Sequence, residues 1–254
     1  MQLPKNSFKA ALAEGRQQIG IWSTIAGGAP AELLACAGFD WILIDTEHAP
    51  LDLPTVHNML QAIAPYPSQA VVRPGWNDPV EIKRLLDIGA QSLLIPYVQT
   101  VDEARRAVAS VRYAPEGMRG VAYMTRAARY GQIPNYIQDA AREICLLLQV
   151  ETASALSEIE GMAALDGVDG IFIGPADLSA SMGFPGQASH PKVKEAVLDA
   201  VRRIRACGKA AGVLTLDQDF TAELIKAGTN FTAVDIDTAI LARGLAQARA
   251  RYPS

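Results

Sequence analysis

The chain has 254 residues, half of them hydrophobic, and this length can bury a substantial core in a single domain spanning residues 1–254. The formal net charge is −4 and the Lys and Arg residues are scattered, which argues against nucleic acid and anionic membranes as partners. No apolar run reaches the roughly 18 residues of a membrane span, and the first residues lack the apolar core of a signal peptide. We therefore expect a soluble, cytoplasmic protein.

Short runs rich in Val, Ile and Leu alternate with helical patterns from one end of the chain to the other. The runs are apolar nearly throughout, as is typical of parallel strands covered on both faces. Many of the helical patterns end in Gly, which stops helices at little cost. In chain order the predicted strands are 19–25, 41–45, 70–73, 92–97, 144–150, 170–174, 211–215 and 231–235.

This order of elements predicts a TIM (β/α)8 barrel, because about eight strand-helix units in roughly 250 residues are typical of that fold. An open doubly wound sheet is the alternative, but TIAGGAP (24–30) lacks the G-x-G-x-x-G spacing of a nucleotide-binding turn. The irregular segment 113–138 is expected to be a loop with short helices that covers a site or meets a neighbouring subunit. The three cysteines, Cys36, Cys145 and Cys207, lie far apart, so we expect them to pack rather than to form disulfides or a zinc site.

Polar side chains follow the ends of several predicted strands. Any one of them is explained equally well as a helix cap or an ion-pair partner. In a TIM barrel, however, the C-terminal strand ends meet at one rim, where the chemistry of this fold takes place. The residues that converge there are Asp45, Glu47, His48, Arg73, Gln149, Glu151, Asp177, Asp235 and Asp237.

Three kinds of chemistry are predicted at this rim. Glu151 and Asp177 suit a hard or borderline divalent ion that keeps positions open for water and substrate, although a pair of structural carboxylates is the alternative. Arg73 offers a planar cation for a carboxylate or an enolate oxygen. His48 is the candidate for proton transfer. The lysines, Lys194 among them, fall in helical patterns or at the wrong rim, so we expect a metal rather than a Schiff base.

Long motifs in this sequence resemble the HpcH/HpaI aldolase family over nearly the whole chain. The resemblance implies a TIM barrel whose last helix is swapped between subunits, and a homo-hexamer built as a trimer of dimers. It also implies a class II pyruvate aldolase that uses Mg²⁺, Mn²⁺ or Co²⁺. The motifs are FDWILIDTEHAP, VVRPGWNDPVEIKRLLDIGAQSLLIPYVQT, RYAPEGMRGV, RAARYGQIPNYI, LLQVET and VDGIFIGPADLSASMG.

The resemblance also assigns roles to individual residues. It implies Glu151 and Asp177 as metal ligands, and Arg73 as the arginine that stabilises the enolate oxygen of pyruvate. It implies His48 as the proton-transfer group, with two acidic partners. The remaining assignments are Asp87 and Asp45 as those partners, Gln149 near the metal, the amides of Gly174 and Ala176 for the pyruvate carboxylate, and Leu214 for substrate binding. Thr46 and Asp235 stand where the family commonly has Gly.

The implied reaction is the reversible retro-aldol cleavage of a 4-hydroxy-2-oxo acid, such as 4-hydroxy-2-oxoheptanedioate, to pyruvate and an aldehyde. Aldolases for 2-dehydro-3-deoxyglucarate or 2-keto-3-deoxyrhamnonate, an oxaloacetate-type decarboxylase and a lyase for CoA esters are alternatives on the same site. A barrel that binds a keto acid without turnover is the non-enzymatic alternative. Acceptor specificity is expected to depend on residues 113–138 and on Thr46.

Overall fold

The computed structural model describes residues 1–252, and its centre is a closed barrel of eight parallel strands, each paired with its neighbours in chain order. The predicted TIM barrel is therefore confirmed, and every predicted strand lies within two residues of the observed bounds. The strands are Gln18–Ser23 (β1), Trp41–Asp45 (β2), Gln69–Arg73 (β3), Ser92–Ile95 (β4), Cys145–Val150 (β5), Gly170–Ile173 (β6), Ala210–Leu214 (β7) and Phe231–Ile236 (β8).

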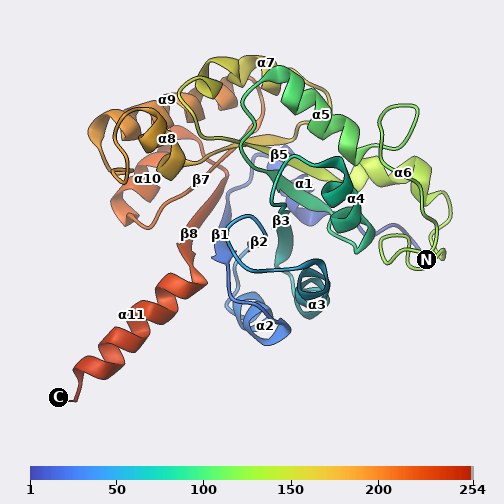
Figure 1. The fold of residues 1–254 in the computed structure, drawn as a ribbon, viewed down its shortest axis with the longest axis horizontal. Helices are drawn as coiled ribbons and strands as arrows, with labels where there is room; N and C mark the ends of the chain where they lie inside the picture. The colour runs from blue at the N-terminus through green and yellow to red at the C-terminus, as the bar shows by residue number, and fades with distance from the viewer. Residues whose placement is uncertain (253–254) are drawn as a thin grey trace.

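Helices surround the barrel, and Figure 1 shows them along its outside. Several begin where an Asp or Thr side chain accepts a hydrogen bond from a backbone N–H of the first turn, as Asp78 and Asp217 do. The helices are Ser7–Ala13 (α1), Gly28–Cys36 (α2), Leu53–Ile63 (α3), Pro79–Asp87 (α4), Val101–Val111 (α5), Tyr136–Glu143 (α6), Ile159–Ala163 (α7), Pro175–Ser181 (α8), Pro191–Ala206 (α9), Gln218–Ala227 (α10) and Asp237–Ala250 (α11), with a 3₁₀ turn at Ala155–Glu158 (η1).

Aromatic side chains fill the inside of the barrel. Trp41 and Phe231 pack with ring centroids 6.0 Å apart, and each ring occupies the space where a Cβ would lie on the neighbouring Gly20 or Gly212. Phe8 of α1 packs on both rings from the N-terminal side, at 5.7 and 6.1 Å. Because side chains of this size leave no channel, the barrel is a packed core and substrates can reach only its mouth.

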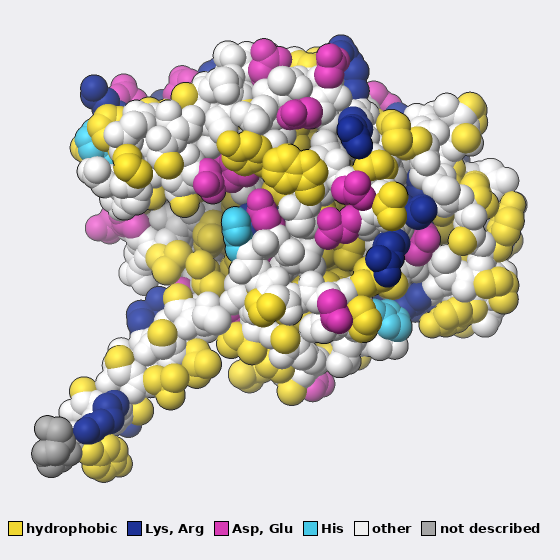
Figure 2. Space-filling view, viewed as in Figure 1, with side chains coloured by type: hydrophobic (Ala, Val, Ile, Leu, Met, Phe, Trp, Pro, Cys, Tyr) yellow, Lys and Arg dark blue, Asp and Glu magenta, His cyan; other side chains and the backbone are white. Residues whose placement is uncertain are grey.

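Helix α11 extends away from the barrel (Figure 1), and apolar side chains lie along it (Figure 2). Ile240, Leu241 and Leu245 are 43, 51 and 61% exposed. An apolar helix face of this kind is costly in water unless a partner covers it. The predicted exchange of the last helix between subunits fits this arrangement and stays a prediction.

One expectation about other parts of the chain needs correction. Cys145 is buried as expected, but Cys36 and Cys207 are exposed, because each lies at the C-terminal end of a helix and points to solvent rather than to the core. The segment 113–138 is irregular up to α6, as predicted, and exposes Val121, Tyr123 and Met124. No helix in residues 1–252 is both long and apolar enough to span a membrane.

Candidate active site

An open cavity of about 750 Å³ lies at the C-terminal ends of the strands. In the surface view, a histidine and several acidic side chains surround a hollow near the middle of the face shown (Figure 2). Trp22 and Phe172, from the aromatic filling of the barrel, contribute to its lining. Nine of the predicted site residues also line it: Asp45, His48, Arg73, Gln149, Glu151, Gly174, Ala176, Asp177 and Leu214.

Arg73 is the last residue of β3 and is only 6% exposed. Its Nε and Nη2 donate to the two carboxylate oxygens of Asp45, at 2.9 and 2.7 Å, and its Nη1 lies 2.9 Å from Oε2 of Glu47. Gln149 Oε1 accepts from Nη1 at 3.4 Å, and the guanidinium carbon lies 5.0 Å from the centre of the Trp22 ring. The guanidinium is therefore fixed in position, with its charge at the cavity.

Asp45 and Glu47 differ in their protonation equilibria although both face Arg73. Burial raises the pKa of Asp45, but the hydrogen bonds and charge of Arg73, with a backbone N–H of Glu47, hold that pKa below its ordinary value. For Glu47, burial outweighs the charges of Arg73 and His48, so its pKa is raised. Its Oε2 is buried and contacts Arg73 without the geometry of a hydrogen bond. Sequence reasoning placed Glu47 at the rim but gave it no role.

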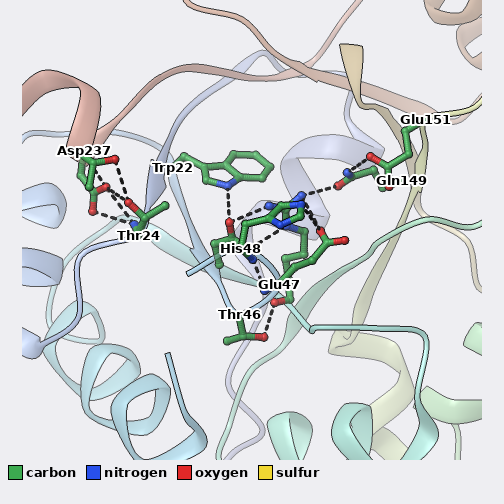
Figure 3. A network of polar contacts seen from close by, with 11 residues as sticks. Trp22, Thr24, Thr46, Glu47, His48, Gln149, Glu151 and Asp237 are labelled. Atoms are coloured by element: carbon green, nitrogen blue, oxygen red, sulfur yellow. Dashed lines mark hydrogen bonds and ion pairs between the residues drawn. The ribbon is translucent and has the colours of Figure 1, made fainter. Parts of the chain in front are cut away.

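Glu151 follows β5 and is 3% exposed. Its Oε1 accepts from the backbone N–H of Tyr97 at 2.9 Å, and its Oε2 accepts from Gln149 Nε2 at 2.5 Å, a contact that Figure 3 shows beside the Glu47 and His48 pair. Burial, with the charges of Asp177 and Glu47 added, raises the pKa of Glu151 to about 7. Such a carboxylate is stabilised in its charged form by a nearby cation.

The donor set fits a divalent metal ion. A Cβ on Gly174 would lie 2.6 Å from Oε2 of Glu151, so the glycine provides the room that the carboxylate occupies. Asp177, in the first turn of α8, presents a second carboxylate to the same cavity. No cluster of three or more His, Cys, Asp or Glu side chains suited to a metal occurs in residues 1–252. Two carboxylates with open positions match the preference of Mg²⁺ for oxygen ligands and retained waters.

His48 lies at the mouth, and its side chain is 67% exposed. Its Nε2 is 3.8 Å from Oε2 of Glu47, and its backbone N–H donates to Asp45. Asp87, its other expected partner, lies at the end of α4 outside this cavity and pairs with Arg119 at 2.8 Å. The pairing of His48 with Asp87 therefore stays a prediction that requires a neighbouring subunit.

The two amides expected to bind a carboxylate are not equivalent. The N–H of Gly174 donates to the carbonyl of Val150 at 3.0 Å, so it is engaged in the strand ladder, and its role in binding a carboxylate stays a prediction. The N–H of Ala176 lies in the first turn of α8, where backbone donors lack intrahelical acceptors. Leu214, at the end of β7, lines the cavity as the resemblance implied.

Lys194 also lines the cavity, which corrects the expectation that no lysine reaches this rim. Its Nζ donates to Oδ2 of Asp217 at 2.7 Å. The helical pattern was right, but Lys194 lies in the first turn of α9, and helices that lead to the next strand of a barrel start at the C-terminal rim. The position of Lys194 near the start of this helix could therefore have placed it at the C-terminal rim from sequence alone.

The residues expected to tune acceptor choice lie elsewhere. Thr46 donates to the carbonyl of Arg73 at 2.7 Å and does not line the cavity, nor does any residue of 113–138.

Two aspartates hold the start of α11. Asp235 pairs with Arg243 of α11. Asp237, at the start of α11, accepts from Thr24 Oγ1 at 2.7 Å and from the backbone N–H groups of Thr24 and Ile25 (Figure 3). That contact ties α11 to the loop after β1.

A TIM barrel that gathers carboxylates, a guanidinium and an imidazole in one cavity at the C-terminal ends of its strands is an enzyme, with its chemistry at the barrel mouth. The chain belongs to the HpcH/HpaI aldolase/citrate lyase family, whose sequence profile matches residues 18–243. It is therefore a carbon–carbon lyase.

Relatives and solved structures agree with this assignment. The chain is 56% identical over 252 residues to a protein of Rhizobium etli named pyruvate aldolase, with 99% of each chain covered. It is 55% identical over 249 residues to a 4-hydroxy-2-oxo-heptane-1,7-dioate aldolase of Salmonella heidelberg, covering 98% of this chain and 95% of that one. The crystal structure of a family member from Burkholderia cenocepacia superposes with a TM-score of 0.93 at 38% identity, covering 97% of this chain and 99% of that one.

Proposed function

We propose that the enzyme catalyses the reversible retro-aldol cleavage of a 4-hydroxy-2-oxo acid to pyruvate and an aldehyde, with a divalent metal ion as cofactor. The observation that carries this proposal is the meeting of two carboxylates, Glu151 and Asp177, with the buried guanidinium of Arg73 in one cavity. A 2-oxo acid needs these groups, since its carboxylate and carbonyl oxygens bear negative charge that grows as the carbon–carbon bond breaks.

Glu151 and Asp177 would hold the metal ion. When bound, such an ion polarises the 2-oxo group of the substrate as a Lewis acid. Gln149 positions one of these ligands, because its amide donates to Oε2 of Glu151 while its carbonyl accepts from Arg73. The same glutamine therefore sets the relative positions of the guanidinium and the metal-binding carboxylate.

Arg73 stabilises the negative charge that develops on the oxygen at carbon 2. Its guanidinium is already held by Asp45 and rests against Trp22, so it does not have to reorganise when the charge appears. The N–H of Ala176, in the first turn of α8, would donate to the substrate carboxylate.

His48 moves the proton. In the cleavage direction its imidazole takes the proton of the 4-hydroxyl as the bond between carbons 3 and 4 breaks, and in the reverse direction it takes one from the methyl group of pyruvate. The carboxyl group of Glu47 faces this imidazole, with its Oε2 3.8 Å from Nε2.

We also propose that the protein assembles as a homo-hexamer, with α11 of one subunit covered by another. The exposed apolar side chains of α11 and of the segment 113–138 support this assembly, because a lone subunit leaves them in water. Mass measured by light scattering tests the proposal. A monomer at micromolar concentration would contradict it.

The test of the reaction is pyruvate release from 4-hydroxy-2-oxoheptanedioate, followed by NADH loss through coupled lactate dehydrogenase. We expect activity that disappears with EDTA and returns with Mg²⁺, Mn²⁺ or Co²⁺. Activity indifferent to chelation would contradict the metal assignment. Oxaloacetate is assayed in parallel as the substrate of a decarboxylase. Pyruvate release from oxaloacetate but not from 4-hydroxy-2-oxoheptanedioate would favour the decarboxylase.

A further inference from the structure

The cavity has a second side that the proposed reaction leaves unused. The charged groups that the proposed reaction uses follow β2, β3, β5 and β6, and in a closed barrel of eight strands β7 lies across from β3. From this β7 side, the cavity is lined by Lys194 of α9, Leu214 at the end of β7, Leu216 and Asp217 of the loop that follows, and Phe220 of α10.

Lys194 is the charged donor on this side, and its ammonium is held in place from two directions. Nζ lies 2.7 Å from Oδ2 of Asp217 and 4.6 Å from the centre of the Phe220 ring. Its side chain is 26% exposed, so it is partly withdrawn from water. An ammonium has three N–H donors, and the salt bridge with Asp217 uses one of them. A restrained ammonium with further donors loses little entropy when it binds a ligand.

The charge of Asp217 is shared with its own helix. Oδ1 accepts from the backbone N–H of Phe220 at 3.1 Å, which makes Asp217 the N-cap of the ten-residue helix α10. The partial positive charge of this helix end offsets part of the carboxylate charge. The positive field of Lys194 is therefore only partly cancelled at the cavity.

We propose that Lys194 binds a terminal carboxylate of the aldehyde, and so determines which aldehydes the enzyme releases or condenses with pyruvate. The inference rests on the proposed function and names the residue that recognises the far end of a short aldehyde that ends in a carboxylate. Leu214 and Phe220 provide apolar surface for the methylene groups between the two ends of such a molecule. Aldehydes with a neutral end gain this apolar contact without the charged one.

The experiment compares two aldehydes of equal chain length in the condensation with pyruvate, using the enzyme loaded with Mn²⁺. Succinic semialdehyde carries the carboxylate, and its methyl ester does not. The measured quantity is the ratio of their kcat/KM values. For Lys194→Gln we expect this ratio to fall by about tenfold or more, the loss of one charge-assisted hydrogen bond. Lys194→Arg should retain most of the ratio, since it keeps the positive charge.

The matched control is Lys192→Gln, which removes an exposed lysine of the same helix that does not line the cavity. It should leave the ratio unchanged. Lys194→Glu should invert the preference toward 3-aminopropanal, whose end is positively charged. If Lys194→Gln remains active with an unchanged ratio, the role of Lys194 is wrong while the aldolase stands. If the wild-type enzyme condenses neither aldehyde with pyruvate, the proposed function itself fails.

Discussion

Asp45 and Arg73 face each other at the same level of the barrel, as register partners at the ends of β2 and β3. Their side chains meet through two hydrogen bonds of 2.9 and 2.7 Å. This planar, two-point contact orients the guanidinium toward the cavity. A lysine cannot reproduce it, because its ammonium is a point charge.

Arg73→Lys is therefore expected to lower kcat by about 10²–10³-fold, the usual cost of losing a positioned group that stabilises developing negative charge. The coupled pyruvate assay measures the effect, and circular dichroism checks that the variant is folded. Turnover within a few-fold of wild type would show that charge alone is sufficient and would remove the geometric argument.

The same ion pair makes stability depend on pH. The pKa of Asp45 is below its ordinary value of 3.8 in the folded protein, so the unfolded chain binds more protons in this range. The contribution is present above the ordinary pKa and is lost as pH falls toward the lowered value. Chemical denaturation between pH 6 and pH 3 should show a steeper loss for wild type than for Asp45→Asn, which has no carboxylate to titrate. Parallel curves would contradict this account.

Gly174→Ala is expected to displace Glu151, because the new Cβ would lie 2.6 Å from its Oε2. Titration with Mn²⁺ should show weaker binding, by about tenfold or more, as expected when a metal ligand is misplaced. Gly75→Ala is the control, since its Cβ finds only ordinary contacts at 3.6 Å. Equal Mn²⁺ affinity in both variants would refute the assignment of Glu151 as a ligand that depends on this glycine.

His48→Gln should slow the exchange of the methyl protons of pyruvate with D₂O, followed by NMR, by about 10²–10⁴-fold, the range for a general base. The exchange isolates proton transfer from carbon–carbon bond cleavage. His57→Gln, a histidine of α3 that does not line the cavity, should exchange at the wild-type rate. An unchanged exchange rate in His48→Gln would show that a group other than His48 takes the proton from pyruvate.

Asp87→Asn is expected to lower the free energy of unfolding by about 3 kcal/mol, because it leaves a buried charge without its partner. The side chain of Arg119 is fully buried, and it pairs with Asp87 at 2.8 Å. Denaturant unfolding measures the loss. Asp139→Asn, which breaks a pair with the exposed Arg142, should cost less than about 1 kcal/mol. A similarly small cost for Asp87→Asn would mean that Arg119 finds another partner.

Much of the fold could be predicted because the strands are apolar on both faces and several of the helical patterns end in Gly. Residues at strand ends, such as Glu151 and Arg73, could be placed at the rim from the order of elements alone. The ion-pair partners of these side chains could not be predicted from sequence. Asp87, for example, pairs with Arg119, which lies in a loop that has no periodic pattern. Lys194 was misplaced although the sequence could have placed it, because it lies in the first turn of a helix that starts at the C-terminal rim of the predicted barrel.

The division of the cavity between two sets of βα units has an evolutionary consequence. Groups for the 2-oxo acid are encoded around β2, β3, β5 and β6, whereas Lys194 and Asp217 are encoded on α9 and before α10. On the proposed role of Lys194, mutations in the second set are expected to change the preferred aldehyde without disturbing the first set. A gene duplicate of this enzyme can thus acquire a new substrate through a few substitutions, while selection preserves the machinery that handles pyruvate.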